Sequence, residues 1–300
     1  MPENFAEQHR NIEFSNNVEA TLRQTPGMLY PLCGSSQNYA GSKAARITNR
    51  FGRVKMTERT TRNGDTPTSD ISSVARFIIP GRTNDIALLK DPDDEEVTEV
   101  DLGSALVNEV AAAAATYHDD MFITGFFGNG WTGETGSMAV PFKSSNIIQH
   151  GGVGITQLKL MATEALIRQR HVNVSREKPI IMLTATDKTA LDSIEEYKNS
   201  LYNENKPLAD GELKPWGIFR FFHFEPDSES LPTSYANILA SGYRNLPVII
   251  PSGMHRGIWH EFKGRIGERP DKSYAEQTYG SARSACVRTD EDRAFILRVQ

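Results

Sequence analysis

The sequence predicts an α+β fold, and three observations carry this prediction. Residues 100–122 have the apolar spacing of one long helix, with an apolar residue at every third or fourth position. A β-rich segment precedes this helix, and a helix, strand, helix unit follows it before several further strands. Helices and strands in this mixed order along one chain are typical of α+β proteins.

The N-terminal residues 1–40 are expected to form an arm. Phe14, Val18 and Leu22 have helical spacing, and the sequence Thr25, Pro26, Gly27 that follows is typical of a helix end. The next residues are rich in Gly, Ser, Pro and Asn, which favours a tether over a buried element. The start MPENFAEQHR lacks the features of a signal peptide, so we expect neither secretion by that route nor insertion into a membrane.

Residues 41–90 are predicted to form a long β-hairpin with a basic surface. Two runs with β-branched and aromatic residues flank the turn-rich sequence NGDTPTSD. The segment has ten basic and four acidic residues, a net charge of +6, whereas residues 91–101 have seven acidic residues and no basic one. Such charges are consistent with solvated faces, but a long hairpin with few apolar residues also suits a contact between copies of opposite charge. The residues predicted to make that contact are Arg53, Arg59, Arg62, Asp93, Asp94, Glu95 and Glu96.

The long helix at residues 100–122 is expected to act as a spine. At about 1.5 Å per residue it would be roughly 33 Å long. Its alanine run, residues 111–115, combines high helix propensity with small side chains, so a sheet and the arm can pack closely over it.

The rest of the chain is predicted to alternate between short helices and strands. Helices are expected at residues 155–172 and after Thr186 or Asp187, around a buried strand at residues 179–184. Further strands are expected at residues 217–225, 234–240 and 247–251, and the chain is expected to end as strand, turn and strand over residues 274–300.

A search for catalytic and ligand-binding motifs finds little. Residues 128–135 have the spacing of a phosphate loop, but Glu134 occupies the lysine position and would repel phosphate, so we interpret this glycine-rich stretch as a flexible or subunit-contacting turn. His118, Asp119 and Asp120 suggest a metal site or a hydrolase, but such residues near a helix end are more often solvent-facing or paired with a neighbour's arginine. Cys33 and Cys286 form no CxxC motif, and whether they pair is left open. We therefore expect no enzyme activity and no cofactor.

Taken together, the order of these segments resembles the major capsid proteins of tailed bacteriophages with the Hong Kong 97 type of fold. The residues that carry the resemblance are LLKDPDD at residues 88–94, the helix end at residues 117–123, the loop at residues 125–136 and YGSARSACVRTDEDRAFILR at residues 279–298.

The resemblance implies a division of the chain into five parts. These are an N-terminal arm (1–40), an extended loop or E-loop lying over the adjacent subunit (41–90), a peripheral domain with the spine helix (91–151), an axial domain (152–256) and a return to the peripheral sheet (257–300).

The resemblance also implies a function and partners. The chain would assemble into hexamers and pentamers of an icosahedral head around double-stranded DNA, in the host cytoplasm and without a cofactor. The expected partners are a portal and a separate scaffolding or decoration protein. The net charge of −5 gives no reason for strong or sequence-specific DNA binding. An encapsulin-like bacterial compartment has the same fold and is the nearest alternative; a hydrolase that uses the residues named above is a different class.

Overall fold

The computed structural model describes residues 27–51, 56, 58, 62, 73–90, 102–194, 197, 213–226, 236–240 and 242–300. The helix predicted within residues 5–24, the distal part of the hairpin and the acidic link at residues 91–101 lie outside this set. Among the described helices, none combines the length and the apolar composition needed to cross a membrane.

The long helix predicted from the sequence is α2 (Leu102–Phe127). It ends at Phe127 rather than at the predicted Phe122, so Gly125 lies inside the helix and does not end it. A Cβ atom at Gly125 would lie 2.2 Å from the carbonyl oxygen of Cys286. The glycine therefore permits close contact between the helix and a strand, and the chain stays helical for another turn.

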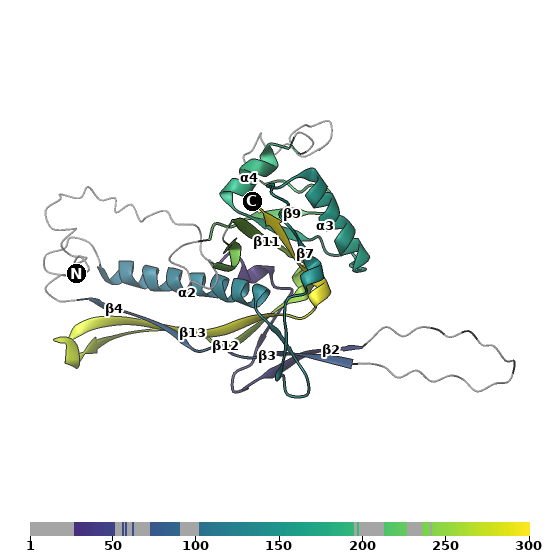
Figure 1. Ribbon diagram of the computed structural model, residues 1–300. Coiled ribbons are helices and arrows are strands. Elements are labelled where there is room, and N and C mark those ends of the chain that lie inside the picture. The colour runs from purple at the N-terminus through teal and green to yellow at the C-terminus, as the bar shows by residue number, and fades with distance from the viewer. Residues whose placement is uncertain are drawn as a thin grey trace.

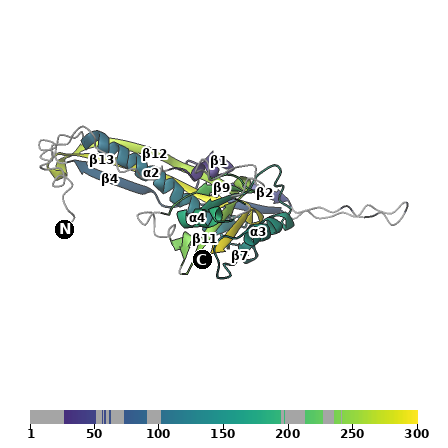
Figure 2. The same ribbon diagram turned by 90° about the horizontal axis from the view of Figure 1, so that it is seen from above.

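A four-stranded sheet runs along α2 (Figures 1 and 2). Its order is β1 (Ser35–Asn38), β12 (Met254–Arg269), β13 (Ala275–Arg288) and β4 (Asn84–Lys90). β12 and β13 form a long antiparallel hairpin, with irregularities on both sides of His260, and β13 lies directly against α2. β12 has no clear strand signal in the sequence, because only the first part of this strand is buried while the rest is exposed.

The predicted basic hairpin is confirmed for two of its strands. β2 (Ala45–Phe51) and β3 (Ser73–Ile78) pair antiparallel, and β2 is the edge strand of their sheet. The end of the predicted hairpin is β4, which pairs with β13 instead. Pro80 and Gly81 interrupt the second run, so that β4 can join the sheet under α2.

The sheet of the hairpin is completed by two short strands. β5 (Gly130–Thr132) pairs with β3 and with β6 (Met138–Val140). Three residues of the stretch 128–135, which was interpreted as a flexible or subunit-contacting turn, therefore form a strand, and a turn follows them before β6.

The upper domain contains a six-stranded sheet covered by two helices (Figure 1). Its order is β7 (Ile147–Ile148), β14 (Ala294–Val299), β11 (Tyr243–Ile249), β8 (Ile180–Leu183) and β9 (Arg220–His223), with β10 (Leu239–Ala240) paired to β11. The helices are α3 (Gln157–Gln169) and α4 (Ala185–Asp192). The strand predicted at residues 234–240 is thus present as the short β10.

The C-terminal residues 257–300 divide between two sheets, which corrects the prediction that they return to one. β13 joins the sheet beside α2, whereas β14 lies between β7 and β11 in the upper domain. The turn at residues 289–293 redirects the chain between them. Five of the six residues of β14 are buried, as expected for a central strand with both faces covered.

The two faces of the upper sheet contribute to two hydrophobic cores. One core, with Leu183, Val248 and Leu297, lies under α3 and α4. The other contains Met182, Ile249 and Ile296, which pack against residues near the end of α2, among them Phe122 and Phe126. Burial of each such side chain contributes about 1.5–3 kcal/mol, so the C-terminal part of α2 is fastened to the upper domain by apolar contacts.

Candidate functional site at the end of the long helix

Most of the predicted contact residues lie outside the described part of the chain. This holds for Arg53, Arg59, Asp93, Asp94, Glu95 and Glu96; Arg62 is described and lies in an exposed turn. The proposed contact between the basic hairpin and the acidic link therefore stays a prediction. The structure describes the base of the hairpin instead, where side chains connect it to α2 and the upper domain.

Arg288, at the end of β13, is the central residue of this junction. Its guanidinium is fully buried. Nη1 donates hydrogen bonds to the carbonyl oxygens of Phe126 and Gly128, the latter at 2.6 Å. The last carbonyl groups of a helix lack partners within the helix and bear partial negative charge, so a cation satisfies and stabilises them. Arg288 thus caps the C-terminal end of α2.

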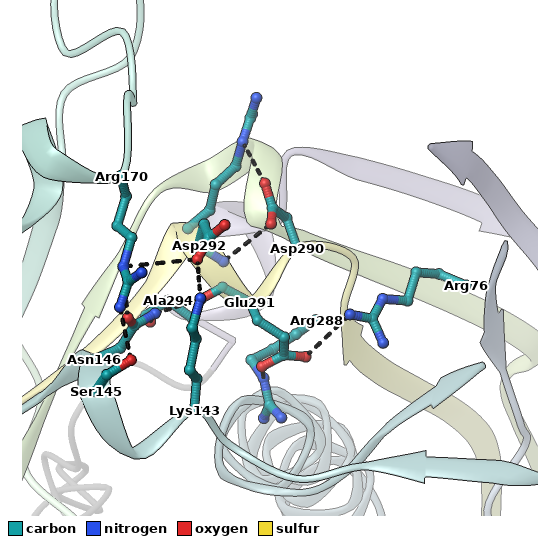
Figure 3. Close-up of polar contacts among 11 residues, drawn as sticks. Arg76, Lys143, Ser145, Asn146, Arg170, Arg288, Asp290, Glu291, Asp292 and Ala294 are labelled. Atoms are coloured by element: carbon teal, nitrogen blue, oxygen red, sulfur yellow. Dashed lines mark hydrogen bonds and ion pairs between the residues drawn. The ribbon is translucent and has the colours of Figure 1, made fainter. Parts of the chain in front are cut away.

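Glu291 connects this cap to the hairpin (Figure 3). Its Oε2 accepts a hydrogen bond from Arg288 Nε at 2.9 Å, and its Oε1 lies 3.8 Å from Nη2 of Arg76 on β3. Burial lowers the pKa of the Arg288 guanidinium, and the negative charge of Glu291 opposes that shift. The acid therefore offsets part of the cost of burying two cations and joins strands from two sheets.

A second group of polar residues connects the same turn to the upper domain (Figure 3). The side-chain amide of Asn146 donates to the carbonyl oxygens of Glu291 and Ala294, and its Oδ1 accepts from Arg170 Nε at 3.1 Å. Asp292 pairs with Lys143 at 2.8 Å. The turn at residues 290–293 thus contacts the hairpin and the upper domain directly, and it is connected to α2 through Arg288.

The hairpin's own base is closed by packing against β5. Phe77 of β3 lies opposite Trp131, and the hydroxyl of Thr132 donates to the carbonyl oxygen of Ala75 at 2.8 Å. Residues 128–135 follow a helix and contain a strand, whereas a phosphate loop follows a strand and leads into a helix. The nucleotide-binding interpretation of this stretch receives no support.

Asp119 holds the N-terminal segment on α2. Its carboxylate accepts backbone hydrogen bonds from Gly27 and Met28 on Oδ2, and from Leu29 and Tyr30 on Oδ1, at 2.8–3.4 Å. Asp119 is only 4% exposed, so its interpretation as solvent-facing or paired with arginine is wrong. It lies on the buried helix face three positions before Phe122, a spacing that signals a shared face.

This arrangement leaves Asp119 unable to act as a metal ligand or as a catalytic acid or base. Both carboxylate oxygens of Asp119 are occupied by backbone amides, and His118 Nδ1 lies 3.0 Å from the hydroxyl of Ser284. Within the described ranges, no group of three His, Cys, Asp or Glu residues is placed to hold a metal ion.

We expect the Asp119→Asn substitution to lower the free energy of unfolding by about 2 kcal/mol. Four backbone amides donate to this side chain, and an amide offers them one acceptor oxygen instead of two and carries no negative charge. Urea denaturation measures the loss, and proteolysis near residues 27–30 should become faster. Glu134→Gln, an acid-to-amide change in the exposed turn between β5 and β6, is the control. Equal stability of the two variants would contradict the role of Asp119.

His255 fixes the segment that follows. Nδ1 lies 2.7 Å from the Ser35 hydroxyl and Nε2 lies 2.9 Å from the Tyr39 hydroxyl. The residue is 3% exposed, and burial lowers its pKa to about 4. In the unfolded chain the histidine pKa is about 6.5, so below that pH the unfolded state binds the proton more readily.

Acidification should therefore destabilise the protein through His255. From pH 7 to pH 5 this residue alone should reduce the free energy of unfolding by about 2 kcal/mol, because the folded form stays neutral until the pH approaches 4. Urea denaturation at both pH values measures this loss. In a His255→Gln variant the same pH change should cost about 2 kcal/mol less than in the wild type; an unchanged pH dependence would show that His255 is not the responsible group.

Comparisons with known proteins give a consistent result. A family model described as phage capsid protein matches residues 6–299. Among solved structures, the head of Helicobacter pylori bacteriophage KHP40 has a TM-score of 0.72 at 10% identity, covering 96% of this chain and 95% of that one. The capsid of cyanophage P-SCSP1u has a TM-score of 0.70 at 13% identity, covering 97% and 93%. The capsid of a native GTA particle has a TM-score of 0.63 at 13% identity, covering 96% and 95%. No curated protein sequence matches this one.

Proposed function

Because the chain belongs to the phage capsid protein family and is a structural major capsid protein with the Hong Kong 97 type of fold, we propose that its basic hairpin binds an acidic surface of the adjacent subunit in the shell. The copies then form hexamers and pentamers of an icosahedral head. The head encloses double-stranded DNA without sequence-specific contacts, and it is assembled in the host cytoplasm. A portal, and a separate scaffolding or decoration protein, are the further partners.

One observation carries this proposal. β2 is the edge strand of its sheet, and among the described strands it pairs only with β3. The segment that contains them has a net charge of +6, and the neighbouring residues 91–101 have seven acids. A charged hairpin at the edge of a sheet suits a partner of opposite charge, and a second copy of this chain supplies one.

The junction around Arg288 supports the same proposal. A hairpin that transmits force between subunits needs a base that is fixed to the rest of its own subunit. The ion pair between Glu291 and Arg76 and the cap on α2 supply such a base. The encapsulin-like alternative is not favoured, since the similar structures reported above are capsids of phages or of a GTA particle.

Charge reversal in the hairpin tests the proposal. We expect the triple variant Arg53→Glu, Arg59→Glu, Arg62→Glu to remain a soluble subunit but to lose most of its particle formation, as measured by sedimentation and electron microscopy. The triple substitution to Lys keeps the charge and should assemble. Normal particles from the Glu variant at low salt would overturn the proposed contact.

A further inference from the structure

Two cysteine thiols meet where the N-terminal segment crosses the long sheet. Cys33 follows the short 3-10 turn η2 (Tyr30–Leu32), and Cys286 lies near the end of β13. Their Sγ atoms are 3.9 Å apart, and both thiols are free. The residues are 253 positions apart in sequence, so only the fold brings them together.

The backbone around both cysteines is held in place by its neighbours. The amide of Cys33 donates to the carbonyl oxygen of Tyr30 at 3.3 Å, and the amide of Gly34 donates to that of Pro251 at 2.8 Å. Cys286 is paired with Arg256 in the β12–β13 ladder, and its carbonyl oxygen lies against Gly125 of α2. The two sulfur atoms therefore face each other in a well-defined part of the fold.

We propose that Cys33 and Cys286 are a redox-sensitive pair that forms a disulfide and fastens the N-terminal segment to β13 once the protein leaves a reducing compartment. A disulfide needs a sulfur separation of about 2.05 Å, so the thiols must approach by roughly 1.9 Å. Disulfides persist outside cells and are rare in the cytosol. The timing of the bond rests on the proposed assembly in the host cytoplasm, whereas the thiol chemistry does not.

The bond forms by two exchange steps with a small-molecule disulfide such as oxidised glutathione. The Cys33 thiolate attacks one glutathione sulfur, the glutathione S–S bond breaks, and the first glutathione leaves as a thiolate. The Cys286 thiolate then attacks Cys33 Sγ, and the second glutathione leaves in the same way. Two protein thiols are oxidised, one glutathione disulfide is reduced to two thiols, and the two protons from the cysteines are taken up by the leaving thiolates.

The surroundings of Cys286 slow the second step. The hydrogen bond with Cys33 and burial raise the pKa of the Cys286 thiol; Asp119 on α2 adds to this, and Arg256 on β12 opposes it. Because the thiolate is the nucleophile, ring closure should accelerate about tenfold for each pH unit while the pH stays below that pKa.

The test uses the purified full chain incubated with oxidised glutathione at pH 7 and pH 8. We expect a peptide that links Cys33 to Cys286 in a non-reducing digest, formed faster at pH 8. We also expect the thermal midpoint to rise by about 5 °C and to fall back with dithiothreitol. Unassembled subunits suffice for these measurements, so the result does not depend on shell formation.

Cys33→Ser and Cys286→Ser serve as controls and should show neither the linked peptide nor the rise in the midpoint. The wild-type mass measurement stands by itself if either variant fails to fold. Three outcomes would overturn the proposal: both thiols alkylated after oxidation and denaturation, glutathione retained on Cys33 without closure, or disulfides only between separate chains.

Discussion

Replacing Arg288 with Met will lower the free energy of unfolding by about 3–5 kcal/mol, although Met matches much of the arginine's volume. The reason is the number of groups that Arg288 satisfies. Without its guanidinium, the carbonyl oxygens of Phe126 and Gly128 lose a donor, and Glu291 keeps its charge in a site where only 12% of the side chain is exposed. Urea denaturation followed by circular dichroism measures the change.

A double-mutant cycle with Glu291→Gln shows where the loss originates. If the unpaired Glu291 carries a large part of it, the double variant will be more stable than the sum of the single effects predicts, by about 1–3 kcal/mol. Additive effects would mean that Arg288 acts through the helix cap alone. A loss below about 1 kcal/mol for Arg288→Met would contradict the central place of this residue in the junction.

The Gly125→Ala variant will be destabilised by about 3 kcal/mol or more, although alanine has the higher helix propensity of the two residues. In an exposed helix, alanine in place of glycine stabilises by about 1 kcal/mol. At residue 125 the added methyl group would lie 2.2 Å from the carbonyl oxygen of Cys286 and 2.8 Å from its Cβ, so α2 and β13 must separate. Thermal and urea denaturation measure the loss.

Gly267 is the matched control for that substitution. It lies on β12, and nothing comes within 4 Å of the position that its Cβ would occupy. Gly267→Ala should leave stability unchanged or raise it by a few tenths of a kcal/mol, through the lower entropy of the unfolded chain. If Gly125→Ala changes stability no more than Gly267→Ala does, α2 and β13 are not in the close contact described above.

The main elements could be predicted because their signals are local. Apolar residues at helical spacing predict α2, and the run AFILRV predicts β14, since each pattern needs only a few neighbouring residues. Which strands share a sheet was harder to predict from the sequence. β4 and β14 joined sheets other than those predicted, because pairing is decided by where turns such as Pro80–Gly81 and residues 289–293 direct the chain.

The junction could not be predicted, because its members are polar residues far apart in sequence. Arg288, Glu291 and Arg76 have nothing in their local sequence that distinguishes them from surface charges. Asp119 was the easiest of the buried polar residues to predict from the sequence. It shares a helix face with Phe122 and Phe126, and an acid on an apolar face needs a partner. That partner is a set of backbone amides, which leave no sequence motif.

Electron microscopy of particles assembled from the purified chain tests most directly whether this chain is a shell subunit whose basic hairpin contacts its neighbour. We expect closed icosahedral shells in which the hairpin that contains β2 and β3 lies over the adjacent subunit. A compact monomer under all assembly conditions, or shells in which this hairpin contacts only its own subunit, would contradict this expectation.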